Sequence, residues 1–512
     1  MTREISASTR WWFAGFGVIA AAFGVVIGSL VAAMDSAYAP LNVVASAAID
    51  IPGAAVKSWA TETFGTNAKT VTMLGVAIAL LILAVIAGLL ARKRLWVGVG
   101  MFLAIGVIGA LAGVQRPGDD IFAVVPSLVA GVTAAVTLWF FDWLASARAR
   151  KEGAGAAIDR RNVLLGGAAI MGAGVAGVFV TRSISAGEEV QAARVATGLP
   201  TAASTLPPLP PSVQAPVPGL SPFITPNDEF YKIDTTLVSP QVDAATWSLS
   251  IGGMARRPFT ITYAELLAMP MEERDITIMC VSNPIGGGYL GNARWLGARL
   301  MPLLEQAGIE PGADQLFSTS VDGWTCSTPL NGLAERDPIL AIGMNGVPLP
   351  IEHGYPVRMV IPGLYGFISA TKWVSKIEAA TYADMPAYWT THGWATDAPV
   401  LTGSRIDLPR QSTRAGTQPI AGVAWAMNGK GISKVEVSVD DGEWLSANLA
   451  DVPNTTTWRQ WWLPFEFTPG THAIAVRATN GEGELQTSEV RDVVPAGATG
   501  FDSRIVQVEA TA

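Results

Sequence analysis

The chain has 512 residues, of which 50% are hydrophobic and only 15% are charged, and its formal net charge is −8. This composition is too apolar for a wholly soluble protein, and the modest acidic charge, without a long Lys/Arg run, argues against nucleic acid as a partner. With only Cys280 and Cys326, the chain has no disulfide framework, no haem attachment motif and no four-cysteine metal site.

The first third of the sequence predicts a membrane anchor of five helices over residues 1–184. Five apolar runs reach or approach the roughly 20 residues that cross the hydrocarbon layer. They begin at Trp11, Val71, Leu95, Ile121 and Val163. Basic residues near residues 3–10, 91–94 and 147–161 fall on alternate sides of these spans. The positive-inside rule then predicts a multi-pass protein of the cell membrane with a cytoplasmic N-terminus, and everything after Thr181 lies outside the cytoplasm.

The pair Arg160–Arg161 before the last span has two interpretations. It resembles a twin-arginine export signal, which would export a domain already folded around a cofactor. It also fits ordinary positive-inside flanking, because Asp159 and Val163 depart from the usual motif.

Composition and periodicity divide the rest of the chain into three parts. Residues 185–222 are proline-rich and predict an extended linker that holds the next domain off the membrane. Residues 223–402 contain short apolar runs with an occasional helical stretch and predict a mixed α+β domain. Residues 403–512 alternate in hydrophobicity around Asp-Gly and Asn-Gly turns, which is typical of an immunoglobulin-like β-sandwich.

Cys280 ends an apolar run and is followed by a loop rich in glycine and asparagine, in ITIMCVSNPIGGGYLGNARWLG. A thiolate at the end of a strand, before backbone amides that can bind a polyanion, suits a soft or high-valent metal. The alternatives are a buried structural cysteine or a disulfide with Cys326. For Asn283, Asn292 and Arg294 in the same stretch, turn formation or surface charge competes with a direct role in the site.

Downstream, the stretch MNGVPLPIEHGYPVRMVIPGLYGFISATKW holds His353, Arg358 and Lys372 between prolines and glycines. Cationic and imidazole donors on stiff turns suit a phosphate. This stretch, together with GNARWLG, resembles the molybdopterin-binding domain of the sulfite oxidase family. The last 100 or so residues, with GVAWAMNGKGISKVEVSVDDGEW and HAIAVRATNGEG, resemble the dimerisation domain of that family.

The resemblance implies a molybdenum-molybdopterin cofactor and a set of site residues. Cys280 corresponds to the protein ligand of molybdenum and is the expected catalytic residue. The expected cofactor-binding residues are Asp228, Tyr231, Lys232, Thr319, His353, Arg358 and Lys372; for Thr319 a plain strand threonine is an equal alternative. Sulfite oxidases carry an active-site tyrosine just before the MNG motif, where this chain has Ile342, and this departure puts sulfite oxidation in doubt.

The resemblance therefore implies a membrane-anchored, extracytoplasmic molybdenum oxidoreductase that transfers an oxygen atom to or from a small S- or N-oxide type substrate. All three histidines lie after residue 350, so the membrane helices cannot ligate a bis-histidine haem. Electrons would then come from a separate partner, a cytochrome or a quinol dehydrogenase, and the last domain implies a homodimer. The alternatives are a non-catalytic binding or scaffold protein that retains the fold, and a transporter, which the lack of charged residues inside the helical cores disfavours.

Overall fold

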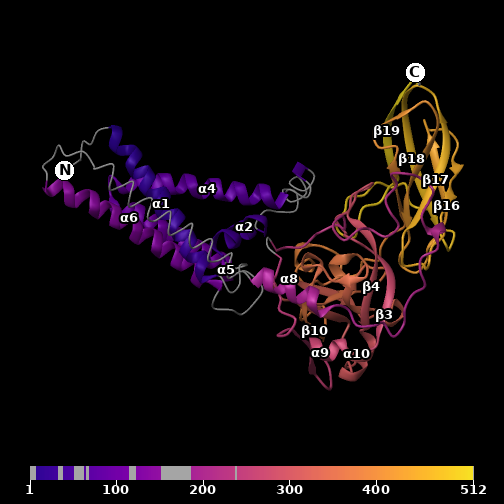
Figure 1. Ribbon diagram of the computed structural model, residues 1–512, viewed down its shortest axis with the longest axis horizontal. Helices are drawn as coiled ribbons and strands as arrows, with labels where there is room; N and C mark the ends of the chain where they lie inside the picture. Colours follow the sequence, from indigo (N-terminus) through magenta and orange to yellow (C-terminus); the bar gives the residue numbers. More distant parts are fainter. Residues whose placement is uncertain are drawn as a thin grey trace. The chain divides into compact units, whose positions relative to one another are not determined.

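The computed structural model describes residues 7–32, 39–50, 63–64, 68–114, 123–151, 186–236 and 239–510 (Figure 1). Two compact units divide the chain. The first contains residues up to Glu189 with Thr235–Pro240, and the second contains Val190–Asp234 and Gln241–Ala512.

The first unit is helical. Its described helices are α1 (Ala7–Val31), α2 (Pro40–Asp50), α4 (Ala68–Ala91), α5 (Leu95–Val114) and α6 (Val125–Lys151). Four of them are long and apolar enough to cross a membrane, over Trp11–Val31, Thr70–Ala91, Leu95–Val114 and Val125–Ala145. They match the first four spans predicted from the sequence. The fifth predicted span, from Val163, and the pair Arg160–Arg161 lie outside the described residues.

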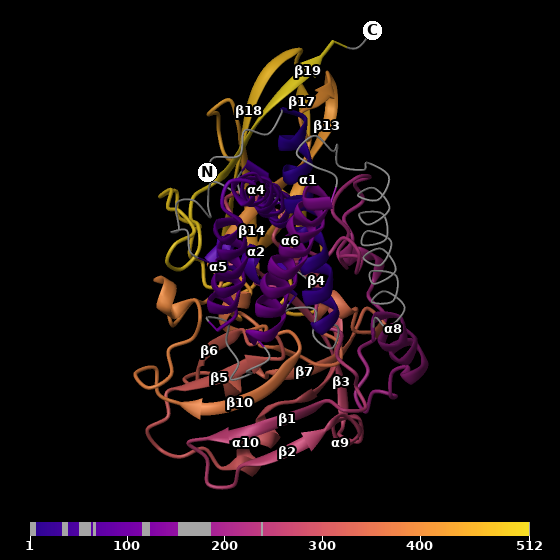
Figure 2. The same cartoon turned by 90° about the vertical axis from the view of Figure 1, so that its left-hand side faces the viewer.

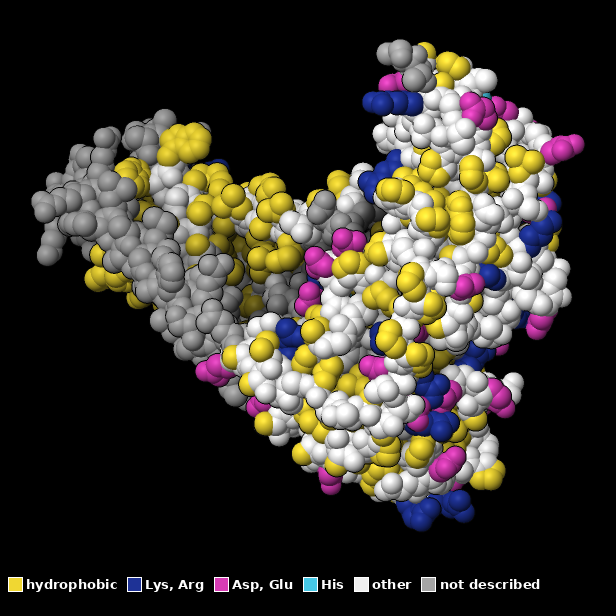
Figure 3. Space-filling view, turned by 45° about the vertical axis from the view of Figure 1, so that its right-hand side comes forward, with side chains coloured by type: hydrophobic (Ala, Val, Ile, Leu, Met, Phe, Trp, Pro, Cys, Tyr) yellow, Lys and Arg dark blue, Asp and Glu magenta, His cyan; other side chains and the backbone are white. Residues whose placement is uncertain are grey.

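Small residues bring the helices of this unit together. A Cβ added at Gly17 of α1 would clash with the backbone of Ala84 in α4, and one added at Gly88 would clash with the backbone of Phe13. The outward side of α4 is apolar instead: Leu74, Ile78 and Ile82 are 54–58% exposed, and hydrophobic side chains cover the described surface of these helices in Figure 3. Close backbone contact inside and apolar side chains outside are what a lipid environment favours.

The second unit begins with the carboxyl-terminal end of a further helix and then forms two sheets with short helices. The helices are α8 (Ala186–Thr197), which starts in the first unit, α9 (Tyr263–Leu267) and α10 (Met301–Ala307). The strands are β1 (Ser248–Gly253), β2 (Phe259–Thr262), β3 (Met271–Met279), β4 (Leu290–Arg299), β5 (Gln315–Ser320), β6 (Thr325–Pro329), β7 (Ile339–Met344), β8 (Val347–Pro348), β9 (Arg358–Val360) and β10 (Val374–Ala380).

One sheet has the order β2-β1-β10-β5-β6, which Figure 2 shows side by side, and the other has the order β3-β4-β7-β8 with β9 on β7. Both sheets contribute to one apolar core, in which Leu249, Trp295 and Ile377 are fully buried. Mixed strands and short helices agree with the α+β organisation predicted for this region.

The C-terminal region is built from strands. They are β11 (Gly403–Leu408), β12 (Ser412–Arg414), β13 (Gly416–Trp425), β14 (Ile432–Val439), β15 (Leu445–Ser446), β16 (Asn448–Leu449), β17 (Arg459–Phe467), β18 (Gly470–Asn480) and β19 (Asp502–Glu509). They form two sheets with the orders β11-β13-β17-β16 and β12-β19-β18-β14-β15. Alternate residues such as Val435, Val437, Ile474 and Val476 are fully buried in a core shared by the two sheets. Because every second side chain of these strands faces this core, the sequence alternates in hydrophobicity.

Residues 198–222, here called the connecting segment, lie on the second unit and do not project as a spacer. Ser204 forms a parallel bridge with Glu272 at the start of β3. Further along, the Ala215 N–H donates to Gln460 Oε1 at 2.6 Å, and Gln460 Nε2 donates to Ser221 O at 2.7 Å. Proline leaves this segment without an α-helix or a long strand, and it contains only the short 3₁₀ helix Pro211–Val213. Hydrogen bonds and apolar contacts at Ala215, Val217 and Leu220 fix it to the β-strands.

Candidate active site

Cys280 follows the last residue of β3, where the chain turns toward β4. The Cys280 N–H donates to Tyr289 O at 2.9 Å, and Asn283 Oδ1 accepts from the Tyr289 N–H at 2.6 Å. The Ser282 N–H donates to Cys280 Sγ at 3.4 Å. These bonds close the glycine-rich turn on itself and hold the thiol, which is 8% exposed, in one place.

Three phenol rings lie within electrostatic range of the Cys280 thiol. Burial is the main cause that raises the pKa of Tyr231, of Tyr289 and of Tyr365, in the last case to about 12, and a charge on Cys280 would raise all three further. Burial also raises the pKa of Cys280 itself, against the hydrogen bonds from Ser282. A thiol in this environment stays protonated unless a metal cation replaces the proton.

His353 and Arg358 each carry a buried nitrogen atom that has no hydrogen-bond partner among the described residues. His353 is fully buried at the end of a short 3₁₀ turn, Ile351–His353. Its Nε2 lies 2.8 Å from Asn227 O and must donate to that carbonyl, which leaves Nδ1 as an unused acceptor. Arg358 starts β9 and is 5% exposed; its Nη1 donates to His353 O at 3.3 Å, and its Nε is unused.

The electrostatics of this pair follow from burial. Burial lowers the pKa of His353 to about 4, with Arg358 and Lys372 adding to the effect, so that the ring is neutral at neutral pH. Burial also lowers the pKa of Arg358, to about 10, and leaves the guanidinium charged. A buried cation with unused donor capacity is costly unless an anionic or strongly accepting group completes its surroundings.

Lys372 lies on the same side of the domain and is already paired. Its Nζ is 2.6 Å from Asp234 Oδ2, donates to Glu352 O at 3.0 Å and stands 4.9 Å from the centre of the Trp373 ring. Lys232 is more exposed and forms an ion pair with Glu352 at 2.9 Å. Tyr231 stacks on Phe230 beside them.

The remaining sequence candidates divide into those outside this cluster and those with structural contacts. Asp228 is exposed on the turn before Phe230. In β5 the Ser318 hydroxyl forms a hydrogen bond of 2.7 Å with the hydroxyl of Thr371, the residue before Lys372. Because side chains alternate along a strand, the neighbouring Thr319 points to the other face of the sheet. The structure thus supports the interpretation of Thr319 as a plain strand residue.

Asn292 and Arg294 make structural contacts on β4. The Asn292 side chain donates to Phe223 O at 2.9 Å and accepts from Thr277 at 3.0 Å. Arg294 forms two hydrogen bonds with the Asp275 carboxylate, at 2.9 and 2.8 Å. For these two residues turn and strand formation accounts for the polar contacts.

Cys280 and Cys326 are both free and buried. The interpretation of the pair as a disulfide is therefore wrong. Cys326 lies in β6, with its sulfur 3.9 Å from the Thr328 hydroxyl, as a structural cysteine would.

The structure adds residues that sequence reasoning missed. Tyr365 lies within the stretch that holds His353 and Lys372, but nothing in its spacing indicates that it lies within electrostatic range of Cys280. Asp322 lies near Lys372 and Asp234. Burial is the main cause that raises the pKa of Asp322, with a smaller contribution from Asp234. No local signal marks it, since it belongs to an ordinary Asp-Gly turn.

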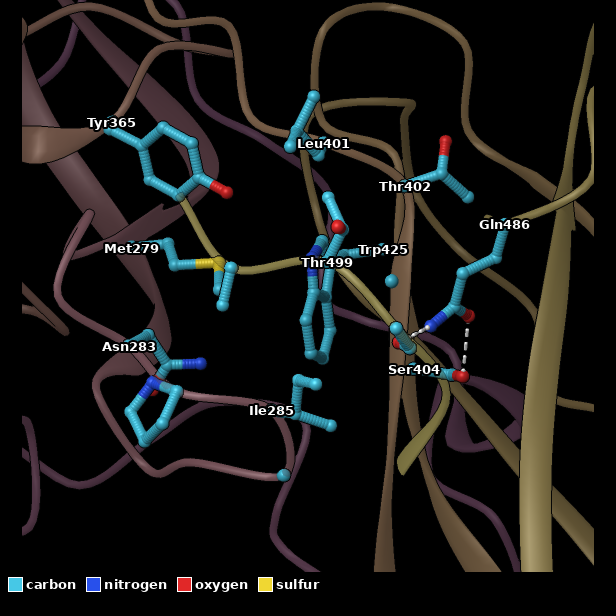
Figure 4. Close-up of a pocket in the computed structure, with 15 residues that line it drawn as sticks. Met279, Asn283, Ile285, Tyr365, Leu401, Thr402, Ser404, Trp425, Gln486 and Thr499 are labelled. Atoms are coloured by element: carbon cyan, nitrogen blue, oxygen red, sulfur yellow. Dashed lines mark hydrogen bonds between the residues drawn. The ribbon is translucent and has the colours of Figure 1, made fainter. Parts of the chain in front are cut away.

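A pocket opens beside the Cys280 turn, between that turn and the C-terminal strands (Figure 4). Its cavity volume is about 30 Å³, and the space amounts to about 350 Å³ when the open solvent at its mouth is included. Its walls come from Met279, Asn283, Pro284, Ile285, Gly286, Tyr365, Leu401, Thr402, Gly403, Ser404, Trp425, Gln486, Ala498, Thr499 and Gly500. Both regions of the second unit therefore build this pocket, which Met279 and Asn283 on either side of Cys280 help to line.

Comparison with known proteins agrees with this division of the second unit. Residues 236–389 match the oxidoreductase molybdopterin binding domain, and residues 402–493 match the Mo-co oxidoreductase dimerisation domain. Sulfite oxidase of Gallus gallus is 28% identical over 324 residues, which cover 53% of this chain and 70% of that protein. The uncharacterized oxidoreductase YuiH of Bacillus subtilis is 32% identical over 152 residues, 30% of this chain and 74% of that protein.

Among solved structures, the sulfane dehydrogenase SoxCD of Paracoccus pantotrophus matches with a TM-score of 0.49 and 24% identity. The match covers 56% of this chain and 81% of that one.

Proposed function

The chain belongs to the sulfite oxidase family of molybdopterin-dependent oxidoreductases, and from this premise we propose that it is a membrane-anchored enzyme whose catalytic unit lies outside the cytoplasm. Its cofactor is molybdenum-molybdopterin, as the sequence predicted. The proposed reaction is the transfer of an oxygen atom to or from a small S- or N-oxide type substrate. The single observation that carries the proposal is that His353 and Arg358 are buried side by side, each with an unused nitrogen atom, while Tyr231 lies within electrostatic range of both Arg358 and Cys280.

The side chains of this cluster fit the cofactor. The neutral His353 can accept a hydrogen bond from a ring N–H at Nδ1, and the charged Arg358 can donate to an anionic oxygen at Nε. Tyr231 lies within electrostatic range of both Cys280 and Arg358 and thus connects the two. We assign Cys280 as the metal ligand and Tyr231, His353 and Arg358 as cofactor-binding residues.

The other four predicted cofactor contacts have weaker support. Lys372 and Lys232 have carboxylate partners, so either would bind a phosphate only by sharing or exchanging that partner. Asp228 is exposed, and Thr319 faces away from the cluster. We propose Lys372 as a peripheral phosphate contact and assign no role to the other three.

The bound group would supply two-electron redox chemistry. Reduction of an S-oxide consumes two electrons and two protons and releases water; the opposite direction takes the oxygen from water and returns two electrons and two protons. All three histidines lie after residue 350, so the membrane helices cannot ligate a bis-histidine haem. We propose that electrons pass through a separate partner, a cytochrome or a quinol dehydrogenase.

The first unit would act as the anchor. Arg92, Lys93 and Arg94 form the turn between α4 and α5, and Trp96 at the start of α5 is 74% exposed, as is usual for a tryptophan at a membrane interface. Trp11, at the start of the first span, is 81% exposed. If the spans alternate, these groups share one membrane face, which basic residues mark as cytoplasmic.

The test is metal and cofactor analysis of the full chain, purified in detergent from a host that makes molybdopterin. We expect one molybdenum per chain, and turnover of at least one S- or N-oxide with an artificial electron donor. Cys280→Ser should retain the pterin and lose activity, because the hydroxyl is a much poorer ligand for the metal. Arg358→Met should lose the pterin as well, since it removes the buried donor.

Arg414→Met is the matched control, because Arg414 is exposed on β12. A chain that contains no molybdenum in a competent host, or a loaded Cys280→Ser variant with normal turnover, would overturn the proposal.

A further inference from the structure

The pocket beside Cys280 is lined by uncharged groups. Its large apolar surfaces come from Met279, Ile285, Leu401 and Trp425, and none of the described lining residues is an Asp, Glu, Lys, Arg or His. Among these described lining residues Tyr365 alone is titratable, and a buried phenol is neutral at neutral pH. An anion that entered this space would lose its hydration without meeting a cation.

The charged groups behind the wall have other partners. Arg405 is 9% exposed and uses all three of its nitrogen atoms. Its Nε donates to Asp407 at 2.6 Å, its Nη1 to Gly287 O at 3.1 Å and its Nη2 to Ser221 at 3.2 Å. The Asp502 carboxylate accepts from the Ile406 N–H at 2.8 Å. Arg405 therefore fixes the Cys280 turn and is not available to a ligand in the pocket.

One further cation lies near the rim. Arg491 Nε donates to Thr499 Oγ1 at 3.2 Å and lies 3.6 Å from Glu489 Oε2, with the side chain 59% exposed. Its charge is partly compensated and largely hydrated, so it adds little attraction for an anion inside.

The polar groups of the far wall bind one another. Ser404 donates to Gln486 Oε1 at 2.7 Å, and Gln486 Nε2 donates to Gly500 O at 2.7 Å, as the dashed lines in Figure 4 show. This wall is polar in composition but offers a ligand little hydrogen-bonding capacity.

At the end near Cys280 two neutral donors remain. Asn283 is 2% exposed, its Oδ1 accepts from the Tyr289 N–H, and its amide nitrogen points into the pocket in Figure 4. The Tyr365 hydroxyl lies at the same end, near Met279. Two uncharged N–H and O–H donors beside an apolar wall match a neutral oxygen acceptor that carries apolar substituents.

We propose that this pocket selects a neutral organic oxide, such as a dialkyl sulfoxide, and excludes oxyanions such as sulfite. Asn283 and Tyr365 are its specificity-determining donors, and Trp425, Ile285 and Leu401 contact the substituents. This inference rests on the proposed function in one respect: it takes the space beside Cys280 as the place where the substrate binds.

The test is equilibrium binding by titration calorimetry to the full chain in detergent, prepared with and without molybdenum. The probes are tetramethylene sulfoxide, which is neutral with an apolar ring, and sodium sulfite. We expect saturable binding of the sulfoxide and no saturable binding of sulfite over the same concentrations. Asn283→Asp keeps the acceptor for Tyr289 but replaces the donor by a negative charge, and it should weaken sulfoxide binding about tenfold.

Thr402→Arg tests the same idea in the opposite direction, because it places a cation in the wall and should create sulfite binding. Thr417→Arg is the matched control: Thr417 is exposed on β13, outside the pocket, and this variant should behave as the parent. The inference is overturned if the parent binds sulfite as tightly as the sulfoxide. It is also overturned if Asn283→Asp binds the sulfoxide normally.

Because binding is measured with and without the metal, the affinities for sulfoxide and sulfite can be determined even if the chain never acquires molybdenum. Absence of the metal would count against the proposed function alone, and binding of sulfite against the inference alone.

Discussion

His353 shows how strongly burial controls a single side chain of this protein. The ring is fully buried, stands at 78° to the Phe230 ring and bonds to the backbone through only one nitrogen atom. Burial lowers its pKa to about 4, from the 6.5 of an ordinary histidine. As the pH falls below neutral, His353 is therefore protonated in the unfolded chain before it is protonated in the folded protein.

We predict that this difference makes the cofactor-free protein sensitive to mild acid. The pKa of His353 is lower in the folded protein than in the unfolded chain. Above pH 6.5 this difference does not affect the free energy of unfolding, and as the pH falls from 6.5 toward 4 it lowers that free energy progressively. At ~1.4 kcal/mol per pH unit the total effect is about 3 kcal/mol. His353→Gln should flatten the dependence of the unfolding temperature on pH between 7 and 4.5, as measured by scanning calorimetry.

The control for this experiment is His392→Gln, because His392 is exposed. It should leave the pH dependence unchanged. Equal acid sensitivity in the parent and in His353→Gln would show that another group is responsible.

At the scale of elements, the connecting segment joins the two regions of the second unit. Gln460 is fully buried on β17 and serves the segment at two points, Ala215 and Ser221. Where the segment ends, the Trp458 side chain donates to Phe223 O at 2.9 Å, and Asn292 of β4 donates to the same oxygen. The segment thus contributes to the stability of the catalytic region as well as connecting it to the anchor.

We predict that Gln460→Leu destabilises the second unit by about 3 kcal/mol, because it leaves the Ala215 N–H and the Ser221 carbonyl buried without partners. The urea midpoint of the full chain, followed by tryptophan fluorescence, measures the effect. Gln411→Leu replaces an exposed glutamine near β12 and should change stability by less than about 0.5 kcal/mol. A Gln460→Leu midpoint equal to that of Gln411→Leu would mean that the segment is only loosely attached.

The elements also show which predictions the sequence supports. The apolar helices and the alternating C-terminal strands could be predicted because their signals are local: composition for the first and a period of two for the second. The place of Cys280 after β3 is equally local. His353 and Arg358 could be named only from a motif, because their partners, Asn227 and Tyr231, lie more than 120 residues earlier.

Long-range geometry accounts for the rest. The parallel pairing of β1 with β10 joins residues about 125 apart, and no spacing rule predicts it. For Thr319 the sequence left a cofactor contact and a plain strand residue as equal alternatives, because a one-residue shift along a strand turns a side chain to the other face. The connecting segment was expected as a spacer because proline-rich composition describes backbone stiffness and says nothing about the surface on which the segment lies.

At the scale of the whole molecule, the membrane orientation is the testable quantity. If the fifth predicted span, from Val163, also crosses the membrane, the basic turn between α4 and α5 and the C-terminus lie on opposite sides. We predict that alkaline phosphatase, which is active only outside the cytoplasm, is active when fused after Ala512 and inactive when inserted after Arg94. A cytoplasmic reporter such as β-galactosidase should give the reverse pattern, and activity of alkaline phosphatase at Arg94 would invert the proposed topology.

The depth of the cofactor cluster has a consequence for biogenesis. His353, Arg358, Lys372 and Cys280 are each at most 8% exposed, and residues of the C-terminal region line the neighbouring pocket. We therefore expect maturation to follow an order in which the bulky prosthetic group binds before the tertiary structure closes around it. An export route that accepts folded domains would suit such an order, and the pair Arg160–Arg161 is the candidate export signal for it.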